Sequence, residues 1–543
     1  MATTSGTSNN EILNGTIDAD SISGLAGDDT LNGQAGNDVL NGGTGQNTAV
    51  YEAPLNEYLL QSDATNTKLQ VKDNVTSPLN EGTDTLEQIQ VLKFSDGSYS
   101  VARLRTAEFQ LNTYIASSQY APSLTKLADG SFVAIWTSEY QDGSSNGVYG
   151  QRFDGNGLAL GTEFKVNTTT SSDQRTQYHG DGGVQRVAAL KDGGFVVAWT
   201  SEGQDGSGWG VYAQRYDSQS IATGNEFKVN TTTTNSQVDP SISALADGGF
   251  VIAWSDDAKD GSGWGVYAQR FSSDASAIGT EFRVNSQTSS NQYNAFAQGL
   301  SGGGYVVAWR DDASNNSNAQ VYAASGAKVG AEITLNTFQN NWQQSPAMAA
   351  LPSGGFIAVW GSDWQDGSYY GVFGQLFSAT GSKVGTEFQV NTTTANGQYH
   401  PQVAVQADGS FAVIWVSEAQ DGSGSGIYAQ EFNSAGQKVG LETPINTFTA
   451  GDQRYPTIAA LADGTYATAW QSADQDGSGR AVEGKLWAPG IQSMLGASTS
   501  IITLRGDDAA NNINQANVSV LDGGAGADTL QGGSGNTLYV VDN

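Results

Sequence analysis

A tryptophan-anchored repeat in the middle of the chain constrains the fold more than any other sequence feature. Tryptophan recurs at positions 136, 199, 254, 309, 360, 415 and 470, with spacings of 63, 55, 55, 51, 55 and 55 residues. Each copy contains about four strand-like runs, such as residues 226–230, 250–254 and 265–271, separated by Gly-rich turn signals. Alternating or apolar runs bounded by such turns indicate β-strands. Four strands repeated seven times predict a seven-bladed β-propeller over residues 104–490.

The phase of the repeat predicts how the ring closes. A strand that begins with Glu, followed by Phe in five copies, and ends with Asn occurs seven times, and its first copy, residues 108–112, precedes the first repeat tryptophan. No copy follows the last tryptophan, so the seventh blade lacks an outer strand of its own. We therefore expect residues 108–112 to complete that blade and remove an exposed edge. An open β-solenoid is the alternative.

Charge and cysteine content narrow the environment and the partners. The 543 residues contain no cysteine and carry a formal net charge of -31. An acidic surface repels phosphate, so we expect no nucleic-acid partner, and the same charge suits a protein that binds many hard cations. No apolar run approaches a membrane span. The first residues lack the basic and apolar parts of a signal peptide, so we expect export by another route.

A nine-residue repeat flanks the propeller repeat on both sides. Three tandem N-terminal copies begin at Gly24, Gly33 and Gly42, and a C-terminal copy begins at Gly523. Glycines allow left-handed turns that direct backbone carbonyls inward, an Asp adds a carboxylate, and an apolar residue two positions later enters a thin core. The expected organisation is a flexible N-terminus (1–10), a β-roll (11–50), a small β insert (51–103), the propeller, and a second β-roll (491–543). The predicted calcium ligands are Asp20, Gly27, Asp29, Gly36, Asp38, Gly45, Asn47, Gly524, Gly526 and Asp528.

These nonapeptides resemble the RTX family of exported bacterial proteins. The resemblance implies a parallel β-roll with Ca²⁺ in its turns, type I secretion, and folding in the calcium outside the cell. Leu25 and Gln34 depart from the pattern at its second glycine, and Asn47 departs at the Asp position. The propeller repeat is similar to repeats of large surface-associated RTX proteins, which names no activity.

The loops that follow the repeat tryptophans offer two further sets of candidate residues. The first set consists of aspartates that either cap Asp-Gly turns or bind one calcium per loop: Asp142, Asp205, Asp260, Asp366, Asp421 and Asp476. The second set consists of aromatic residues at loop tips, which can stack on sugars or dock a protein: Trp209, Trp264, Trp364, Tyr369 and Tyr370.

Three functions remain open from the sequence. The leading prediction is a structural protein of the bacterial exterior, such as an S-layer, sheath or filament subunit, because two roll ends on one chain could stack head to tail. The alternatives are a calcium-dependent lectin or adhesin that uses the aromatic and acidic propeller face, and a calcium-dependent extracellular hydrolase. No catalytic residues are predicted: only two histidines exist, and no hydrolase or phosphate-loop motif is found.

Overall fold

The computed structural model describes residues 2–43, 47–62, 69–73, 81–89, 91–105, 108–180, 185–462, 464–487, 500–505, 512–515, 520–522, 529–532 and 538–540. These residues form strands and turns, with one short 3-10 helix, η1 (Leu55–Glu57), and no α-helix. Within these ranges, no helix is long and apolar enough to cross a membrane. The chain divides into two compact units, residues 108–490 and residues 1–107 with 491–543. The predicted all-β class is confirmed.

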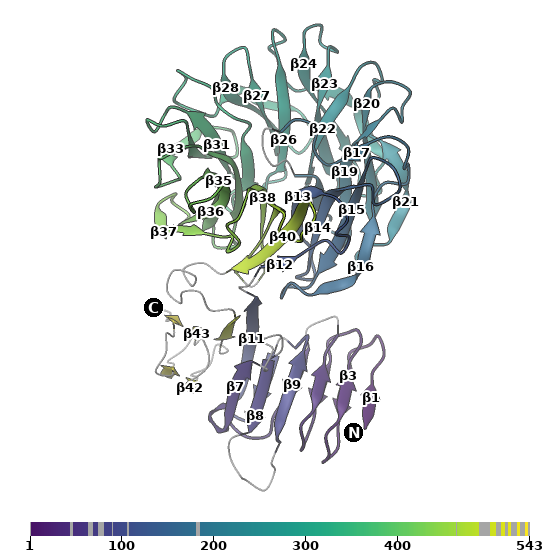
Figure 1. The fold of residues 1–543 in the computed structure, drawn as a ribbon, viewed down its shortest axis with the longest axis vertical. Helices are drawn as coiled ribbons and strands as arrows, with labels where there is room; N and C mark the ends of the chain where they lie inside the picture. Colours follow the sequence, from purple (N-terminus) through teal and green to yellow (C-terminus); the bar gives the residue numbers. More distant parts are fainter. Residues whose placement is uncertain are drawn as a thin grey trace. The chain divides into compact units, whose positions relative to one another are not determined.

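Residues 108–490 form the predicted seven-bladed propeller, with one antiparallel sheet per blade (Figure 1). Blade 1 consists of β13 (Gln119–Lys126), β14 (Phe132–Glu139), β15 (Asn146–Phe153) and β16 (Ala159–Lys165); blade 2 of β17 (Gln174–Arg175), β18 (Val187–Ala189), β19 (Phe195–Glu202), β20 (Trp209–Tyr216) and β21 (Ala222–Lys228); blade 3 of β22 (Gln237–Ala244), β23 (Phe250–Asp257), β24 (Trp264–Phe271) and β25 (Ala277–Arg283); blade 4 of β26 (Gln292–Gly299), β27 (Tyr305–Asp311), β28 (Asn316–Tyr322) and β29 (Lys328–Thr334); blade 5 of β30 (Ala347–Ala350), β31 (Phe356–Asp363), β32 (Tyr370–Phe377) and β33 (Lys383–Gln389); blade 6 of β34 (Gln398–Val405), β35 (Phe411–Glu418), β36 (Ser425–Phe432) and β37 (Lys438–Pro444); blade 7 of β38 (Gln453–Ala460), β39 (Tyr466–Ala473), β40 (Arg480–Trp487) and β12 (Phe109–Gln110).

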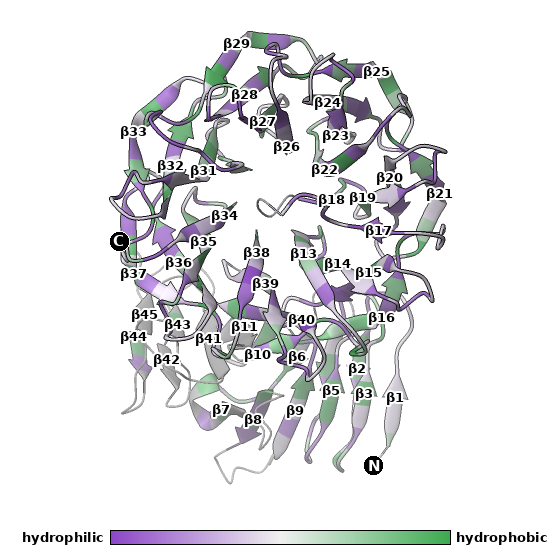
Figure 2. Ribbon diagram, turned by 45° about the horizontal axis from the view of Figure 1, so that its top comes forward, coloured by the Kyte–Doolittle hydropathy of each residue, from purple (hydrophilic) through white to green (hydrophobic). Residues whose placement is uncertain are grey.

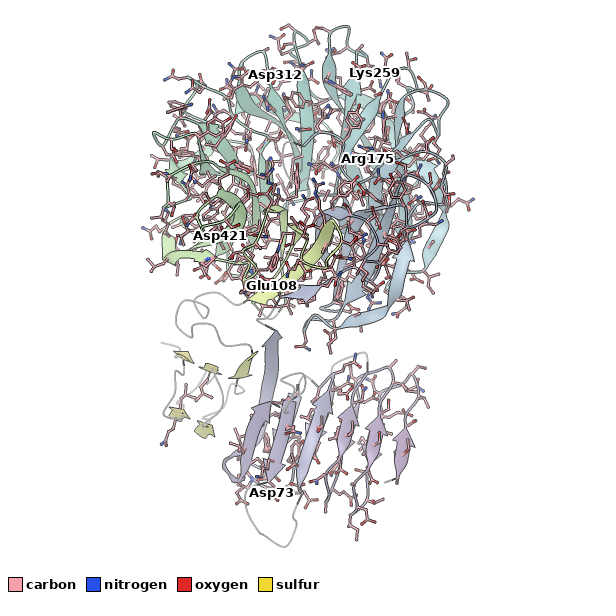
Figure 3. The ribbon with its side chains drawn as sticks, in the orientation of Figure 1. Asp73, Glu108, Arg175, Lys259, Asp312 and Asp421 are labelled. Atoms are coloured by element: carbon pink, nitrogen blue, oxygen red, sulfur yellow. The ribbon has the colours of Figure 1, made fainter. Side chains whose placement is uncertain are left out.

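The seventh blade takes its outer strand from the start of the propeller sequence. Strand β12 pairs antiparallel with β40, with Phe109 opposite Gly484 and Gln110 opposite Glu483. Glu108, labelled beside this blade in Figure 3, accepts hydrogen bonds from the backbone and hydroxyl of Thr447 in the preceding blade. The two ends of the repeat are therefore joined within one sheet.

The same glutamate contact ties neighbouring blades around the ring. Glu163, for example, accepts the N–H of Thr113 at 2.8 Å, and Glu281 accepts the N–H of Thr231 at 2.7 Å. The seven repeat tryptophans are at most 1% exposed and pack between sheets. A repeat that presents the same acid and the same aromatic residue in each copy thus provides both the core and the links between blades.

The innermost strands surround a cavity of about 340 Å³. Small and apolar residues line it, among them Ala188, Ala244, Ala349 and Ala404. Figure 2 shows these strands around the middle of the ring. Blade 2 therefore differs from the others, because its inner strand is split into β17 and β18.

The other unit contains the repeats of both termini in shared sheets. One sheet has the order β1 (Thr3–Ser5), β3 (Ser21–Ser23), β5 (Val39–Asn41), β9 (Thr83–Glu87), β8 (Leu69–Asp73) and β7 (Tyr58–Ser62). A second has the order β2 (Ile12–Asn14), β4 (Thr30–Asn32), β6 (Thr48–Val50), β10 (Val91–Phe94), β11 (Gly97–Arg105), β41 (Ser500–Arg505), β43 (Val520–Asp522) and β45 (Leu538–Val540). Strands β42 (Asn512–Gln515) and β44 (Thr529–Gly532) pair with each other.

The N-terminal strands are parallel and wind as a β-roll over a thin core. Ile22, Leu31, Leu40 and Ala49 are at most 1% exposed. Their period of nine places alternate copies in opposite sheets, so each sheet receives one apolar residue for every 18 residues of chain. This arrangement is the predicted roll.

The domain boundaries differ from those expected. Strand β11 runs through Arg105 and pairs along its length with β41, so residues 104 and 105 belong with the roll and not with the propeller. The segment expected as a separate insert supplies β9 and β10, which extend the two roll sheets. Residues 11–50, 51–103 and 491–543 therefore fall in one unit. Pairing between strands distant in sequence, which no local pattern encodes, decides this.

Candidate calcium centre and propeller face

One carboxylate oxygen of each repeat aspartate takes part in a ladder between turns. Asp38 Oδ1 accepts the N–H of Asp20 at 2.7 Å, and Asp29 Oδ1 accepts the N–H of Glu11 at 2.9 Å. Asp20 Oδ1 accepts the N–H of Ala2 at 2.9 Å. These bonds span 18 residues and align the acids in two stacks of turns. The second oxygen of each acid is left for another partner.

The turn glycines have the conformations that the pattern requires. Gly27 and Gly36 have φ of 110° and 126°, and a Cβ on either would collide with the backbone of an earlier turn. Leu25 and Gln34, which replace the second glycine, nevertheless have φ of 72° and 67°, close to the 76° of Gly43. The two departures therefore leave the turn shape unchanged.

Asp29 and Asp38 have the environment expected of calcium ligands. Their Oδ2 atoms are buried and have no hydrogen-bond partner, and each residue is 1% exposed. Asp29 Oδ2 and the Gly42 carbonyl oxygen both border Gly24, where a Cβ would collide with each of them. Buried acceptors grouped without a donor are costly, and Ca²⁺ binds carboxylate and carbonyl oxygens together. These residues fit the ion that the resemblance implies.

Asp20 and Asn47 differ from the two inner acids because protein groups already satisfy their side chains: donors for Asp20 and carbonyl acceptors for Asn47. Asp20 Oδ2 accepts the N–H and the hydroxyl of Thr16 at 2.6 and 2.8 Å. The Asn47 amide donates to the carbonyls of Gly43 and Gln88, both at 3.2 Å. A threonine hydroxyl in one turn and an amide NH₂ in the other take the place that a cation would fill. The N-terminal array thus has two inner acids that need a cation and two outer positions that do not.

Four of the predicted ligands cannot be assessed in this way. Gly45, Gly524, Gly526 and Asp528 lie outside the described residues. Leu530, the apolar residue of the C-terminal copy, packs against the roll core.

The propeller-loop aspartates act as turn caps in the structure. Oδ1 of Asp142, Asp366 and Asp421 accepts the N–H of the serine two residues later, at 3.0 Å in each loop. Asp205, Asp260 and Asp476 make the same bond. Among the described residues, no three acidic or histidine side chains converge in a way that could hold a metal ion. The geometry supports turn capping, the first of the two roles considered for these residues.

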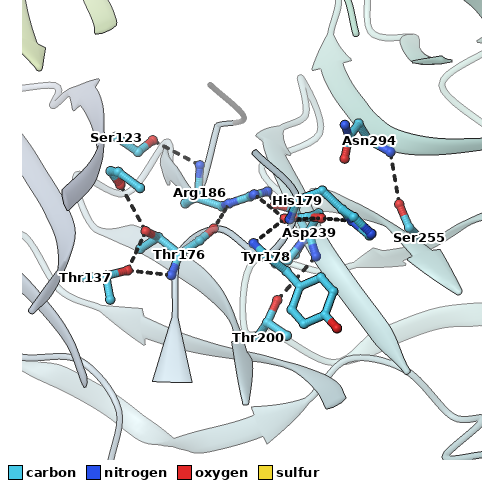
Figure 4. A network of polar contacts seen from close by, with 12 residues as sticks. Ser123, Thr137, Thr176, Tyr178, His179, Arg186, Thr200, Asp239, Ser255 and Asn294 are labelled. Atoms are coloured by element: carbon cyan, nitrogen blue, oxygen red, sulfur yellow. Dashed lines mark hydrogen bonds and ion pairs between the residues drawn. The ribbon is translucent and has the colours of Figure 1, made fainter. Parts of the chain in front are cut away.

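The insertion in blade 2 is held by a buried charged network (Figure 4). Asp239 accepts the N–H of Tyr178 at 2.8 Å and of His179 at 3.0 Å, and its Oδ2 lies 2.6 Å from His179 Nδ1. Arg186 Nη2 lies 3.1 Å from Asp239 Oδ1, and the same guanidinium bonds the carbonyls of Thr176 and Pro240. Burial alone would raise the pKa of Asp239, but the His179 bond and the Arg186 charge outweigh it and lower the pKa.

A continuous row of rings and cations runs from this network across blades 2 to 5. Tyr178 contacts Trp209 at 5.2 Å between ring centroids, and His179 contacts Trp264 at 5.0 Å and Tyr293 at 5.7 Å. The row is extended by two guanidinium groups and one further tryptophan: Arg175 lies over Trp209 at 4.9 Å, and Arg310 lies over Tyr293 and Trp342 at 5.3 and 4.6 Å. Tyr178 and Trp342 are 38% and 40% exposed, so the row is open to solvent at both of these rings.

The five aromatic residues singled out from the sequence fall into two groups. Trp209 and Trp264 belong to the row and are linked through Tyr178 and His179. Of the others, Trp364 and Tyr369 lie in the β31–β32 loop of blade 5 and Tyr370 begins β32, and the rings of Tyr369 and Tyr370 are 5.0 Å apart.

Sequence reasoning missed most of the polar residues of this site. Asp239 occupies an inner-strand bulge with φ of 53°, and His400 occupies the same bulge in blade 6 with φ of 54°. Burial, with the nearby Arg454 charge, lowers the pKa of His400 to about 4. The longer spacing in blade 2, which breaks the repeat, was the available signal for the Tyr178–Arg186 insertion.

The chain is similar to several solved structures at low sequence identity. A protein of unknown function from Dyadobacter fermentans is 10% identical with a TM-score of 0.43, covering 71% of this chain and 98% of its own. The Hadza microbial sialidase Hz136 is 11% identical with a TM-score of 0.42, covering 78% and 73%. The Penicillium chrysogenum alpha-L-arabinanase is 14% identical with a TM-score of 0.39, covering 70% and 98%. Such values carry no argument about activity.

Sequence comparison identifies the terminal repeats. No curated protein matches the chain. The family model of the RTX calcium-binding nonapeptide repeat matches in four copies, over residues 5–49 and 519–538. This agrees with the roll geometry and with the unpartnered oxygens of Asp29 and Asp38. The chain is thus a seven-bladed β-propeller flanked in sequence by RTX nonapeptide repeats, and these repeats bind calcium.

Proposed function

We propose that this protein is an extracellular, calcium-dependent lectin or adhesin whose propeller binds carbohydrate. The observation that carries the proposal is the row from Trp209 through His179 to Trp342, in which successive rings contact one another and two guanidinium groups lie over rings of the row. Aromatic rings stack on apolar sugar faces, and neighbouring charged groups bond hydroxyls or acidic substituents. Each of the four blades supplies different residues to the row, and a specific binding site requires such differences between the repeats.

The nonapeptide repeats support a location outside the cell. Their resemblance to exported RTX proteins favours type I secretion and folding where calcium is abundant. Metal binding that orders a thin roll contributes directly to its folding free energy. Calcium would thereby restrict the folded, binding-competent form to the exterior.

The binding role is tested with Trp264→Ala and a matched control, Trp364→Ala. Trp364 is 56% exposed but lies outside the row. Glycan-array binding in calcium is expected to fall at least about tenfold for Trp264→Ala, because stacking on such a ring contributes on the order of 1–2 kcal/mol, and to persist for Trp364→Ala. Equal binding by both variants, or no glycan bound by the parent, would contradict the proposal. If the parent cleaves the glycan that it binds and Asp239→Asn does not cleave it, the protein is instead a hydrolase.

Assembly into an S-layer, sheath or filament is a second candidate, supported by the sheet edges. The outermost strands of the eight-stranded sheet are β2 and β45, and among the described residues each pairs on one side only. Each is parallel to its sheet neighbour, β4 or β43. A second copy could add head to tail and continue the sheet. Calcium-dependent growth in light scattering would favour this role, and a stable monomer at millimolar calcium would oppose it.

A further inference from the structure

The insert contributes a turn that copies the second half of a nonapeptide. Strand β9 pairs parallel with β5, and Leu86 lies opposite Leu40. Asp84 Oδ1 accepts the N–H of Asp38 at 2.9 Å, which repeats the bond that Asp38 makes with Asp20. The segment Gly82-Thr-Asp84-Thr-Leu86 therefore occupies the register of Gly36-Asn-Asp38-Val-Leu40, although about forty residues separate the two segments and the family match ends at residue 49.

The backbone of this turn follows the roll as well. Gly82 has φ of 75°, and a Cβ there would collide with the carbonyl of Gly36, just as a Cβ on Gly36 would collide with the turn at residues 18 and 19. Leu86 is 5% exposed and continues the apolar column of the roll core. Glycine, acid and apolar residue each have the role of their counterparts in the repeats.

The gap between this turn and the preceding one contains acceptors without donors. Asp38 Oδ2 has no hydrogen-bond partner, and Asp38 is only 1% exposed. In the other stack, the Asp29 N–H donates to Asn47 of the next turn, and the Asn47 amide donates to carbonyls. In this stack, the Asp38 N–H donates to Asp84 of the next turn, which is a second buried carboxylate. Asp29 Oδ2 stays unpartnered beside that amide, and the gap next to Asp38 has the charge of a second carboxylate in addition.

Two neighbouring groups surround the same gap. The hydroxyl of Tyr51 is buried and lies next to the carboxylate of Asp84. Glu81, 5% exposed, accepts the N–H of Glu52 at 3.3 Å and bonds the Tyr58 hydroxyl. Among the described residues, no Lys or Arg forms an ion pair with Asp38, Glu81 or Asp84. Buried carboxylates require a compensating positive charge or lose their own.

We propose that Asp38 and Asp84 bind a calcium ion between the last N-terminal repeat turn and the insert, beside Tyr51. Two carboxylates and the carbonyls of the adjacent turn are the oxygen ligands that calcium prefers. Half of the site comes from residues that no nonapeptide motif encodes. Binding at this position couples the insert to the roll, so calcium orders β9 together with the repeats.

The test uses terbium as a luminescent calcium probe on the full-length, calcium-stripped protein. Tyrosine transfers excitation to a nearby terbium ion, and Tyr51 is adjacent to this site but not to Asp29. Asp84→Asn is expected to reduce tyrosine-sensitised emission at saturation by at least about threefold, and to remove one calcium from the stoichiometry measured by equilibrium dialysis. The matched control, Asp29→Asn, removes one calcium from the other stack and retains that emission.

A second variant distinguishes loss of the calcium site from misfolding of Asp84→Asn. Tyr51→Phe leaves both carboxylates in place, so it is expected to keep the parent calcium stoichiometry and to lower the sensitised emission, of which Tyr58, with its ring 5.2 Å from that of Tyr51, retains a part. If Asp84→Asn keeps the parent stoichiometry and emission, the site does not exist. If Tyr51→Phe retains full emission, the ion is not beside Tyr51, and the proposed position is wrong.

Discussion

Glu483 makes the stability of the propeller depend on pH in a way that one substitution can isolate. It lies in β40 opposite Trp470 and beside the closing strand β12, and it is 4% exposed. Blades 1, 2, 3 and 6 place a tyrosine at this position, opposite their own tryptophan. Burial, followed by the charges of Glu108 and Asp476, raises the pKa of Glu483 to about 8.

The sign and size of the effect follow from this pKa. Between the ordinary value of 4.5 and about 8, the folded state holds a proton that the unfolded chain has released. Stability is therefore fully present below pH 4.5 and falls as the pH rises toward 8, by at most about 1.4 kcal/mol per pH unit. The largest loss of unfolding free energy that this group can cause between pH 5 and pH 8 is about 4 kcal/mol. Because β12 is a short edge strand that can admit water, we expect about half of this, on the order of 2 kcal/mol.

Glu483→Gln removes the ionisation and keeps the size of the side chain. All 12 tryptophans lie within residues 136–487, so their fluorescence follows urea unfolding of the propeller alone. The variant is expected to equal the parent at pH 5 and to exceed its stability by about 2 kcal/mol at pH 8. Glu202→Gln, at an exposed carboxylate, is the control and leaves the parent slope unchanged. Parallel pH profiles for parent and Glu483→Gln would refute the reasoning.

Three further predictions concern the blade 2 network, the roll and calcium removal. Arg186→Met leaves Asp239 buried with fewer donors and is expected to destabilise the propeller by about 3 kcal/mol in the same urea assay; a loss below about 1 kcal/mol would mean that the pair does not hold the insertion. Thr16→Val removes the hydroxyl bond to Asp20 Oδ2 and leaves only the backbone N–H of residue 16 as its donor, so the calcium midpoint of the roll measured by far-UV circular dichroism should rise; an unchanged midpoint would mean that the hydroxyl does not stabilise Asp20. Excess EGTA should increase proteolysis within residues 2–105 while the tryptophan spectrum of the propeller stays native; equal protection with and without chelator would mean that calcium is not needed for the roll.

The amino-acid sequence by itself determined the repeating parts of this protein. Seven tryptophans that recur every 51 to 63 residues and a spare first strand at residues 108–112 are local, periodic signals, and each has a direct physical counterpart in a blade or its closure. The nonapeptides likewise encode a roll, because glycine conformation, acid and apolar residue recur within nine positions. Periodicity is readable from the sequence because each copy meets the same environment.

Tertiary structure decided what depends on the breaks in that periodicity. The partners of Asp239 and the placement of Asp84 next to Asp38 join residues from different turns or blades. A sequence states that an acid is present, but whether its oxygen meets a hydroxyl, an arginine or a second carboxylate depends on which backbone lies next to it. The same side chain is therefore a turn cap, a structural ion-pair partner or a calcium ligand according to its three-dimensional neighbours.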